Sequence, residues 1–259
     1  MISNIIFCFT GTGNSLKAAK DISTHLSDCL IVSMADDNNK YLHSSVQKIG
    51  FIFPVYYLGI PSQVRDFIEK IQFHNPVPYI FSIATCGRFH GNSLRELNGI
   101  LKRKGTQLSY GNYVQMGDNA IVLYNAKGSS PQIEQKYNSQ ITSIIQDIKS
   151  TKYAPVKKEL GIVNYYHNMR IKKASLTDMG YQISSSCISC GKCQMICPAK
   201  NIEIIKGSPS FQHRCQQCMA CIQLCPQNAI NYKNKTQKRQ RYHNPNISIQ
   251  DLIHLQNNG

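Results

Sequence analysis

One spacing of cysteines constrains this chain more than any other feature. The pattern C-x2-C-x2-C-x3-C-P begins at Cys187 and again at Cys215. Three thiolates on a tight C-x2-C-x2-C turn can hold three irons of one [4Fe-4S] cube, and the fourth iron then needs a more distant cysteine. The sequence therefore predicts two such clusters. Their expected ligands are Cys187, Cys190, Cys193, Cys197, Cys215, Cys218, Cys221 and Cys225.

The main alternative for these cysteines is zinc. Structural zinc sites use two C-x2-C pairs separated by a longer loop, so that two pairs make one tetrahedral site. Two quartets with 2-2-3 spacing do not match that arrangement. Disulfides are disfavoured as well, because no export signal precedes the cysteines. Iron–sulfur ligation is the better interpretation.

Residues 181–232 resemble the bacterial two-cluster ferredoxins, in which this spacing is the signature of two [4Fe-4S] clusters. In that family the fourth cysteine of each motif binds the other cluster. The resemblance implies a small α+β domain with crosswise ligation. One cluster would be held by Cys187, Cys190, Cys193 and Cys225, and its partner by Cys215, Cys218, Cys221 and Cys197.

A second motif lies near the N-terminus. The apolar run 5–9 ends in Thr10-Gly11-Thr12-Gly13-Asn14-Ser15, and the apolar residues that follow recur with a helical period. This order predicts a strand, a loop and a helix. Hydroxyls and backbone N–H groups of such a loop can surround a phosphate at the helix N-terminus. The two glycines alone are weak evidence, since the loop lacks both the third glycine of a dinucleotide fingerprint and the lysine of a P-loop.

The loop 10–15 resembles the T-x-T-G-N-T phosphate loop of flavodoxins, with Ser15 in place of the last threonine. That loop binds the terminal phosphate of FMN. The resemblance implies an α/β domain with a five-stranded parallel, doubly wound sheet in the order 2-1-3-4-5, and FMN at the switch point between the first and third strands. The expected strands are 5–9, 31–33, 49–53, 79–85 and 107–115, and helices are expected near 60–71, 93–104 and 131–149.

Two further loops should reach the flavin ring in such a fold. Flavodoxins place a stacking aromatic residue after the third strand, where this chain has Tyr56 and Tyr57, and a small residue whose peptide flips on reduction, for which Gly59 is nearest. The alternative is that the tyrosines only cap the sheet edge. These loops offer Arg88 and little acid, which predicts a flavin that is easier to reduce than in acidic flavodoxins. The expected contacts are Pro54, Val55, Tyr56, Tyr57, Gly59, Thr85, Cys86, Gly87, Arg88, Gly91 and Asn92.

The two modules together resemble the flavodoxin-ferredoxin fusion family of anaerobes. We expect a flavodoxin-like FMN-binding domain over 1–150, a basic connecting strap over 151–180, a ferredoxin-like domain over 181–232 and a basic C-terminal tail over 233–259. The implied function is electron transfer between the two clusters, FMN and external redox proteins. The alternative is an FMN-dependent reductase of a small molecule, with the clusters as an internal wire. Whether the chain is an enzyme stays open at this point.

Charge and hydropathy narrow the range of partners. The net charge is +15, and residues 151–259 carry 15 Lys and Arg against 4 Asp and Glu. Each oxidised cluster with its thiolates adds about two negative charges, so much of this basic excess compensates the clusters and nucleic acid is not expected as a partner. The sequence has no run of eighteen apolar residues and no secretory signal pattern. We therefore expect a cytoplasmic protein without a membrane partner.

Overall fold

The computed structural model describes residues 2–35, 41–43, 45–73, 78–154, 156 and 162–257. Residues 157–161 of the expected strap and 258–259 of the expected tail lie outside these ranges. Five parallel strands form one sheet in the order β2-β1-β3-β4-β5, which confirms the predicted topology. The strands are β1 (Asn4–Cys8), β2 (Cys29–Ser33), β3 (Lys48–Pro54), β4 (Tyr79–Cys86) and β5 (Tyr110–Gln115).

The central strands are buried along almost their whole length. All five residues of β1 are buried, and β3 and β4 are exposed only at their ends. Such continuous apolar runs are expected of parallel strands that are covered on both faces. Strand β5 begins at Tyr110, three residues later than predicted, and just before it the Leu108 N–H donates to the Asn98 side chain at 2.9 Å.

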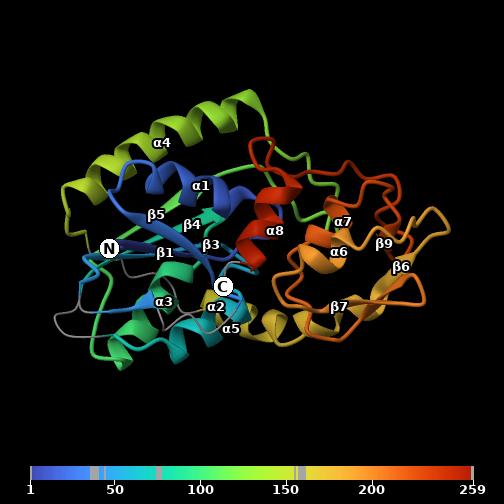
Figure 1. The fold of residues 1–259 in the computed structure, drawn as a ribbon, viewed down its shortest axis with the longest axis horizontal. Helices are drawn as coiled ribbons and strands as arrows, with labels where there is room; N and C mark the ends of the chain where they lie inside the picture. Colours follow the sequence, from blue (N-terminus) through green and yellow to red (C-terminus); the bar gives the residue numbers. More distant parts are fainter. Residues whose placement is uncertain are drawn as a thin grey trace.

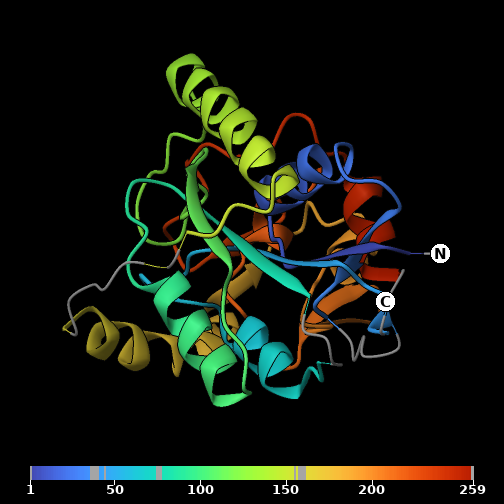
Figure 2. The same ribbon diagram turned by 90° about the vertical axis from the view of Figure 1, so that its left-hand side faces the viewer.

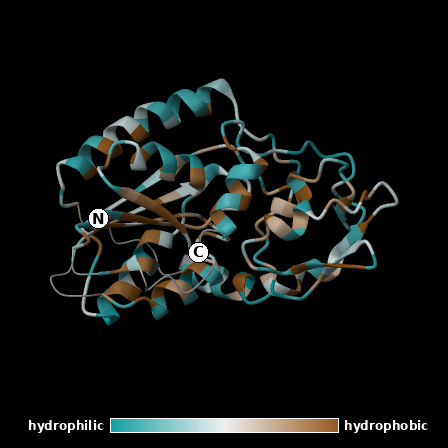
Figure 3. Ribbon diagram, in the orientation of Figure 1, coloured by the Kyte–Doolittle hydropathy of each residue, from teal (hydrophilic) through white to brown (hydrophobic). Residues whose placement is uncertain are grey.

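Helices cover the sheet on both sides (Figures 1 and 2). Helices α1 (Asn14–Ser23) and α4 (Pro131–Lys149) pack on one face, and α2 (Ser62–Lys70) and α3 (Ser93–Arg103) pack on the other. Figure 3 shows the apolar strands between these layers, with polar residues outside. The parallel register brings the carboxyl ends of β1, β3 and β4 to one edge of the sheet.

The cysteine-rich part is a small α+β unit beside this edge (Figure 1). Strands β6 (Tyr181–Ile183) and β9 (Ile230–Tyr232) form one antiparallel pair, and β7 (Ile202–Ile205) and β8 (Ser208–Phe211) form another. The short helices α6 (Lys192–Met195) and α7 (Ala220–Gln223) follow equivalent positions of the two cysteine motifs. Helix α5 (Ile162–Ile171) and the 3-10 helix η2 (Ala174–Gly180) precede this unit and lie within the region expected to be a strap.

The segment after β9 crosses back onto the sheet unit. It ends in α8 (Ile249–Asn257), which sequence analysis did not predict, and Leu252 and Leu255 are buried in the same core as α1 and α4. Lys20 of α1 and Asp251 of α8 form an ion pair of 2.6 Å. The last part of the chain is therefore a structural layer of the first unit. No helix in the described ranges combines the length and apolar character needed to cross a bilayer.

Candidate cofactor sites

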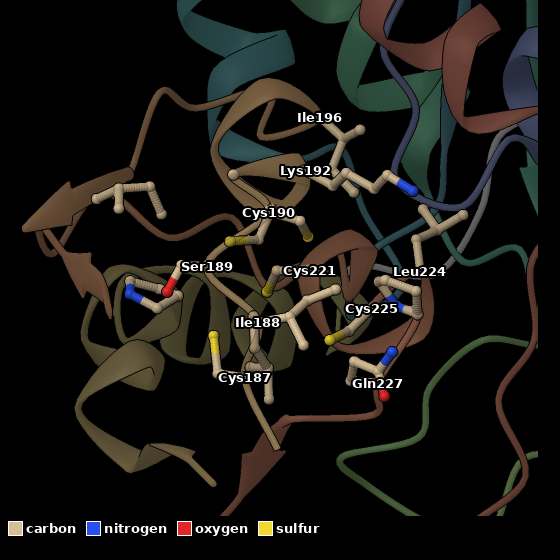
Figure 4. A pocket seen from close by; sticks show the side chains of 16 residues that line it. Cys187, Ile188, Ser189, Cys190, Lys192, Ile196, Cys221, Leu224, Cys225 and Gln227 are labelled. Atoms are coloured by element: carbon tan, nitrogen blue, oxygen red, sulfur yellow. The ribbon is translucent and has the colours of Figure 1, made fainter. Parts of the chain in front are cut away.

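The first cysteine group, called here the outer quartet, consists of Cys187, Cys190, Cys193 and Cys225. All four line one cavity, which Cys221 also borders. Figure 4 shows Cys187, Cys190 and Cys225 around this space, with Ile188 and Leu224 beside them. Gly191 precedes α6 and has a φ of 70°. Nothing within 4 Å would meet a Cβ there, so the positive φ is what favours glycine. Residues of both cysteine motifs therefore line this cavity.

The inner quartet is formed by Cys215, Cys218, Cys221 and Cys197. The first three are each 8% exposed, whereas Cys190 of the outer quartet is exposed. The pKa of Cys215 is raised to about 11, by burial first and then by the Asp178 carboxylate and the Cys197 thiol. Burial likewise raises the pKa of Cys193 to about 11, with contributions from the other three outer thiols. The cysteines that raise these two pKa values thus belong to the same predicted quartet as the thiol itself, while the assignment of individual ligands stays a prediction.

Backbone N–H groups face the sulfur atoms in a repeated pattern. The N–H of Asn201 lies 3.3 Å from Cys197 Sγ, and that of Ala229 lies 3.3 Å from Cys225 Sγ, in each case four residues beyond the last cysteine of the motif. These donors and apolar walls fit a cluster, because N–H···S bonds stabilise its negative charge. Among the described residues, no three cysteine, histidine or carboxylate side chains gather closely enough to hold a single metal ion.

A cleft of about 740 Å³ opens at the carboxyl ends of β1, β3 and β4. Three predicted loops share it, as the sheet register requires. The predicted residues that line the cleft are Thr10, Gly11, Thr12, Asn14, Ser15, Pro54, Val55, Tyr56, Tyr57, Thr85, Cys86, Gly87 and Arg88. One region of the sheet edge therefore gathers most of the expected flavin contacts.

Four predicted residues lie outside the cleft lining. Gly13 packs against Ile247 of the returning C-terminal segment, and a Cβ on Gly59 would lie 2.5 Å from the His167 ring. Gly91 lies against the Leu58 carbonyl group, and the Asn92 N–H donates to that same oxygen at 2.9 Å. These four residues pack behind the loops. We had expected them to face the flavin instead.

The loop 10–15 presents hydroxyls and the N-terminus of α1. Thr10 Oγ1 accepts a bond of 3.2 Å from the Gly13 N–H, and Ser15 Oγ shares one of 2.8 Å with Thr85 Oγ1. Helix α1 starts at Asn14 and has no acidic residue in its first turn. Both features suit an anion, because the helix N-terminus carries unpaired N–H groups and partial positive charge.

A tight turn carries Tyr56 and Tyr57 into the cleft. Tyr56 and Gly59 exchange two backbone bonds of 3.0 Å, and the central residues Tyr57 and Leu58 have φ values of 50° and 67°. Such φ values strain residues other than glycine by about 1–3 kcal/mol each, so surrounding contacts must hold the turn. The Tyr56 hydroxyl is buried and has no hydrogen-bond partner in the described part of the chain. Its pKa is raised by burial first, and then by the Cys218 and Cys215 thiols.

Two stretches of the chain match family models described as "4Fe-4S binding domain", residues 184–200 and 211–231. They contain all eight cysteines of the two quartets. The chain is a flavodoxin-like domain fused to a 4Fe-4S ferredoxin domain. The matched 4Fe-4S segments and their eight cysteines support electron transfer as the function of the protein. The predicted resemblance to a flavodoxin-ferredoxin fusion is confirmed to this extent.

Individual proteins are similar to this chain either over a short segment or at low sequence identity. The chain is 42% identical over 45 residues to one component of the ion-translocating oxidoreductase complex of Methanosarcina acetivorans, which is 17% of this chain and 17% of that relative. A flavodoxin from the domain Archaea superposes with a TM-score of 0.40 and 12% identity over 57% of this chain and 99% of that one. A Fusobacterium nucleatum flavodoxin, solved with flavin mononucleotide, superposes with a TM-score of 0.39 and 14% identity over 57% of this chain and 96% of that one. The fold assignment itself comes from the strand order.

The ferredoxin domain supplies part of the cleft of the flavodoxin-like domain. Gln217 and Met219, which flank Cys218 of the inner quartet, line the cleft. From the sequence, residues 181–232 were placed in the ferredoxin-like domain, and neither residue was given a role at the cleft. The two domains therefore share the wall between the inner quartet and the expected flavin.

Other cleft residues come from segments that carry no recognisable motif. The loop after β5 contributes Asp118, and a Cβ on Gly87 would lie 3.0 Å from an Asp118 carboxylate oxygen. The expectation of little acid in the cleft loops overlooked this carboxylate. Helix α5 contributes Tyr166 from the region expected to be a strap. Only the topology could have predicted the position of Asp118, because the loop after a parallel β5 must start at the same sheet edge as the other cleft loops.

Proposed function

We propose that the protein carries electrons between an external redox protein and an FMN in the cleft, through the outer cluster and then the inner cluster. FMN exchanges one or two electrons and each cluster exchanges one, so the chain would convert between these two modes. The proposal includes a cytoplasmic location, with other redox proteins as partners and neither nucleic acid nor a membrane involved. The limits 1–150 and 181–232 stay our proposal for the two domains.

The observation that carries this proposal is the position of the inner quartet beside the cleft. Gln217 and Met219 border the cleft, and Cys218 between them touches the phosphate loop. An electron at the inner cluster would therefore be separated from a flavin by little more than one layer of side chains. The buried Tyr56 hydroxyl near Cys215 and Cys218 supports the same path.

The exposure of the outer quartet indicates where electrons would enter or leave the protein. Cys190 is exposed, and the neighbouring Ile188 is 59% exposed. Apolar surface beside an exposed redox centre suits brief contact with another protein. We therefore assign the outer cluster to exchange with the external partner.

Cofactor content tests the proposal directly. Anaerobically prepared protein should contain about eight irons and one FMN, because two [4Fe-4S] clusters and one flavin are expected. The variant C218S should keep FMN but lose its reduction by a one-electron donor, whereas C29S, on a half-buried strand cysteine, should behave as the parent protein. Colourless, iron-free or zinc-only protein would reject the proposal, as would equally fast flavin reduction in C218S.

A second candidate is reduction of a small molecule on the flavin. Four large side chains around the cleft are exposed: Phe89, Leu123, Tyr124 and Tyr166, at 66%, 51%, 50% and 43%. An apolar rim of this kind favours a planar apolar acceptor. Steady turnover of small acceptors without any protein partner would favour this candidate, and reoxidation only by a second redox protein would favour the carrier.

A further inference from the structure

A group of three titratable or charged side chains, of which His167 is buried, lies directly behind the turn that carries Tyr56 into the cleft. The side chain of His167, on α5, is 3% exposed, and its Nδ1 lies 3.1 Å from the Tyr56 carbonyl oxygen. Its Nε2 lies 3.5 Å from a carboxylate oxygen of Glu96 on α3 and 3.4 Å from a guanidinium nitrogen of Arg65 on α2. Arg65 and Glu96 also form an ion pair. Three helices thus meet at one imidazole that holds the turn.

The neighbours of His167 favour a neutral ring with its proton on Nδ1. A carbonyl oxygen can only accept a hydrogen bond, so Nδ1 must carry the proton that faces Tyr56. A guanidinium can only donate, so Nε2 presents its lone pair to Arg65. This tautomer is neutral. The pKa of His167 agrees with it, since burial lowers that pKa more than Glu96 raises it, and Arg65 lowers it further.

A proton added at Nε2 has an acceptor in place. The new N–H can donate to Glu96, while Nδ1 keeps its bond to Tyr56. The Glu96 and Arg65 side chains are 20% and 31% exposed, so solvent can reach Nε2 along Glu96. In the described part of the chain, the groups that act on His167 are Arg65 on α2, Glu96 on α3 and the backbone of Tyr56 and Tyr57 on the turn. On α5 itself, Tyr166 and Arg170 act on Tyr57, and Arg170 lies 5.1 Å from the Tyr57 ring centre.

We propose that His167, Glu96 and Arg65 form a proton-binding site that follows the charge of a flavin bound in the neighbouring cleft. This inference rests on the proposed function, because it requires FMN in the cleft. An external one-electron reductant supplies the electrons, solvent supplies the proton, and an N–H bond forms at His167 Nε2. A negative charge at about 10 Å, with an effective dielectric constant of about 20, raises the proton affinity of an imidazole about tenfold.

Linkage makes this coupling measurable on the flavin side. If reduction raises the proton affinity of His167 about tenfold, then protonation of His167 favours reduction of the flavin by the same factor. This coupling should therefore make the equilibrium constant for reducing bound FMN up to about tenfold larger at low pH, where His167 is protonated, than at high pH, where it is neutral. H167Q should remove this factor. E96Q should weaken it, because Nε2–H then loses its charged acceptor.

The first experiment is a redox titration of bound FMN in the full-length, cluster-loaded protein at several pH values. The parent protein and H25Q, which alters an exposed histidine on another surface, should show the pH-dependent factor, and H167Q should not. An unchanged pH profile in both H167Q and E96Q would overturn the inference while leaving FMN binding and the proposed function intact. Failure of FMN to bind the parent protein would overturn both.

The second experiment does not depend on flavin chemistry. The ¹⁵N NMR signals of the His167 ring in FMN-free protein should report the neutral Nδ1–H tautomer at pH 7. The pKa of His167 should be higher in the parent protein than in E96Q, because the Glu96 carboxylate favours the charged imidazole. An Nε2–H tautomer or a charged imidazolium at pH 7 would overturn the inference. The pKa comparison separates a proton-binding site from a merely structural histidine.

Discussion

Gly11 of the phosphate loop lies against Cys218 of the inner quartet. A Cβ atom on Gly11 would collide with the Cys218 carbonyl oxygen and would lie 2.9 Å from the Cys218 Cβ. Both partners are fixed parts of their domains, so no flexible side chain can move aside. The loop expected to hold phosphate is therefore also a place where the ferredoxin domain packs tightly on the flavodoxin-like sheet.

The first prediction concerns this contact. G11A should lower the free energy of unfolding by about 1–3 kcal/mol, because the added methyl overpacks a rigid interface. It should also slow electron transfer from the clusters to FMN, measured by stopped-flow reduction, because the domains must separate slightly. G99A is the matched control: nothing lies within 4 Å of a Cβ at Gly99 on α3, so it should stabilise the helix by about 0.5–1 kcal/mol. Equal stabilities for G11A and the parent protein would contradict the packing argument.

The second prediction separates crosswise from sequential ligation. C225S should abolish the cluster of Cys187, Cys190 and Cys193, although Cys225 belongs to the other motif, and C197S should abolish the cluster of Cys215, Cys218 and Cys221. Each variant should lose about four of eight irons. Rapid flavin reduction should fail in C197S, because the inner cluster lies beside the cleft. Loss of the inner cluster in C225S, detected by EPR and by that failure, would support sequential ligation instead.

The sequence predicted the parts of this molecule that local patterns encode. The parallel sheet follows from apolar runs that alternate with helical periods, and its strand order follows from the resemblance of loop 10–15 to flavodoxins. The loops after β1, β3 and β4 lie together because parallel strands end at one edge. The cysteine quartets follow from a duplicated spacing. The chemistry of these segments is contained in a few neighbouring residues, so one sequence was enough.

The parts that were not predicted depend on contacts between distant residues. Helix α8 has only nine residues, and it is held by Leu252 and Leu255 against a core formed more than a hundred residues earlier in the chain. In the sequence, His167 is one of several residues in a basic, tyrosine-rich stretch and is not distinguished by any motif. Only the fold brings it into contact with Glu96 and Tyr56. Asp118 enters the cleft from a loop without a motif. No local pattern specifies such long-range contacts.

The third prediction tests the returning C-terminal segment as a support for the phosphate loop. The Tyr242 hydroxyl donates to Asn14 Oδ1 at 2.9 Å, and Asn244 Nδ2 donates to the same oxygen at 3.1 Å. Y242F keeps the ring but removes one bond worth about 0.5–1.5 kcal/mol, so FMN should bind roughly 2–10-fold more weakly. FMN fluorescence quenching measures this change. Y153F, at an exposed tyrosine, is the control, and equal FMN affinity in both variants would show that Asn14 needs no such support.

The fourth prediction concerns the dependence of α8 on pH. Asp251 accepts from Lys20 Nζ at 2.6 Å and from the Ser248 N–H at 2.9 Å, and its own N–H donates to Ser248 Oγ at 3.1 Å, which makes a capping box at the start of the helix. The Lys20 bond, and then the Ser248 N–H, lower the pKa of Asp251 to about 2.

Because the folded-state pKa of Asp251 lies below its unfolded value of about 3.9, its contribution is complete above about pH 4 and disappears as the pH falls toward about 2. D251A should therefore be less stable than the parent protein by about 0.5–2 kcal/mol at pH 7, with the difference shrinking between about pH 4 and pH 2. Thermal unfolding from pH 7 to pH 2 measures the stability difference between D251A and the parent protein. Loss of the clusters in acid affects both proteins, so it cancels in this comparison. E203Q, at an exposed carboxylate on β7, should show no such pH-dependent difference. A D251A deficit that stays constant down to pH 2 would mean that the carboxylate charge contributes nothing and that the side chain acts only through packing.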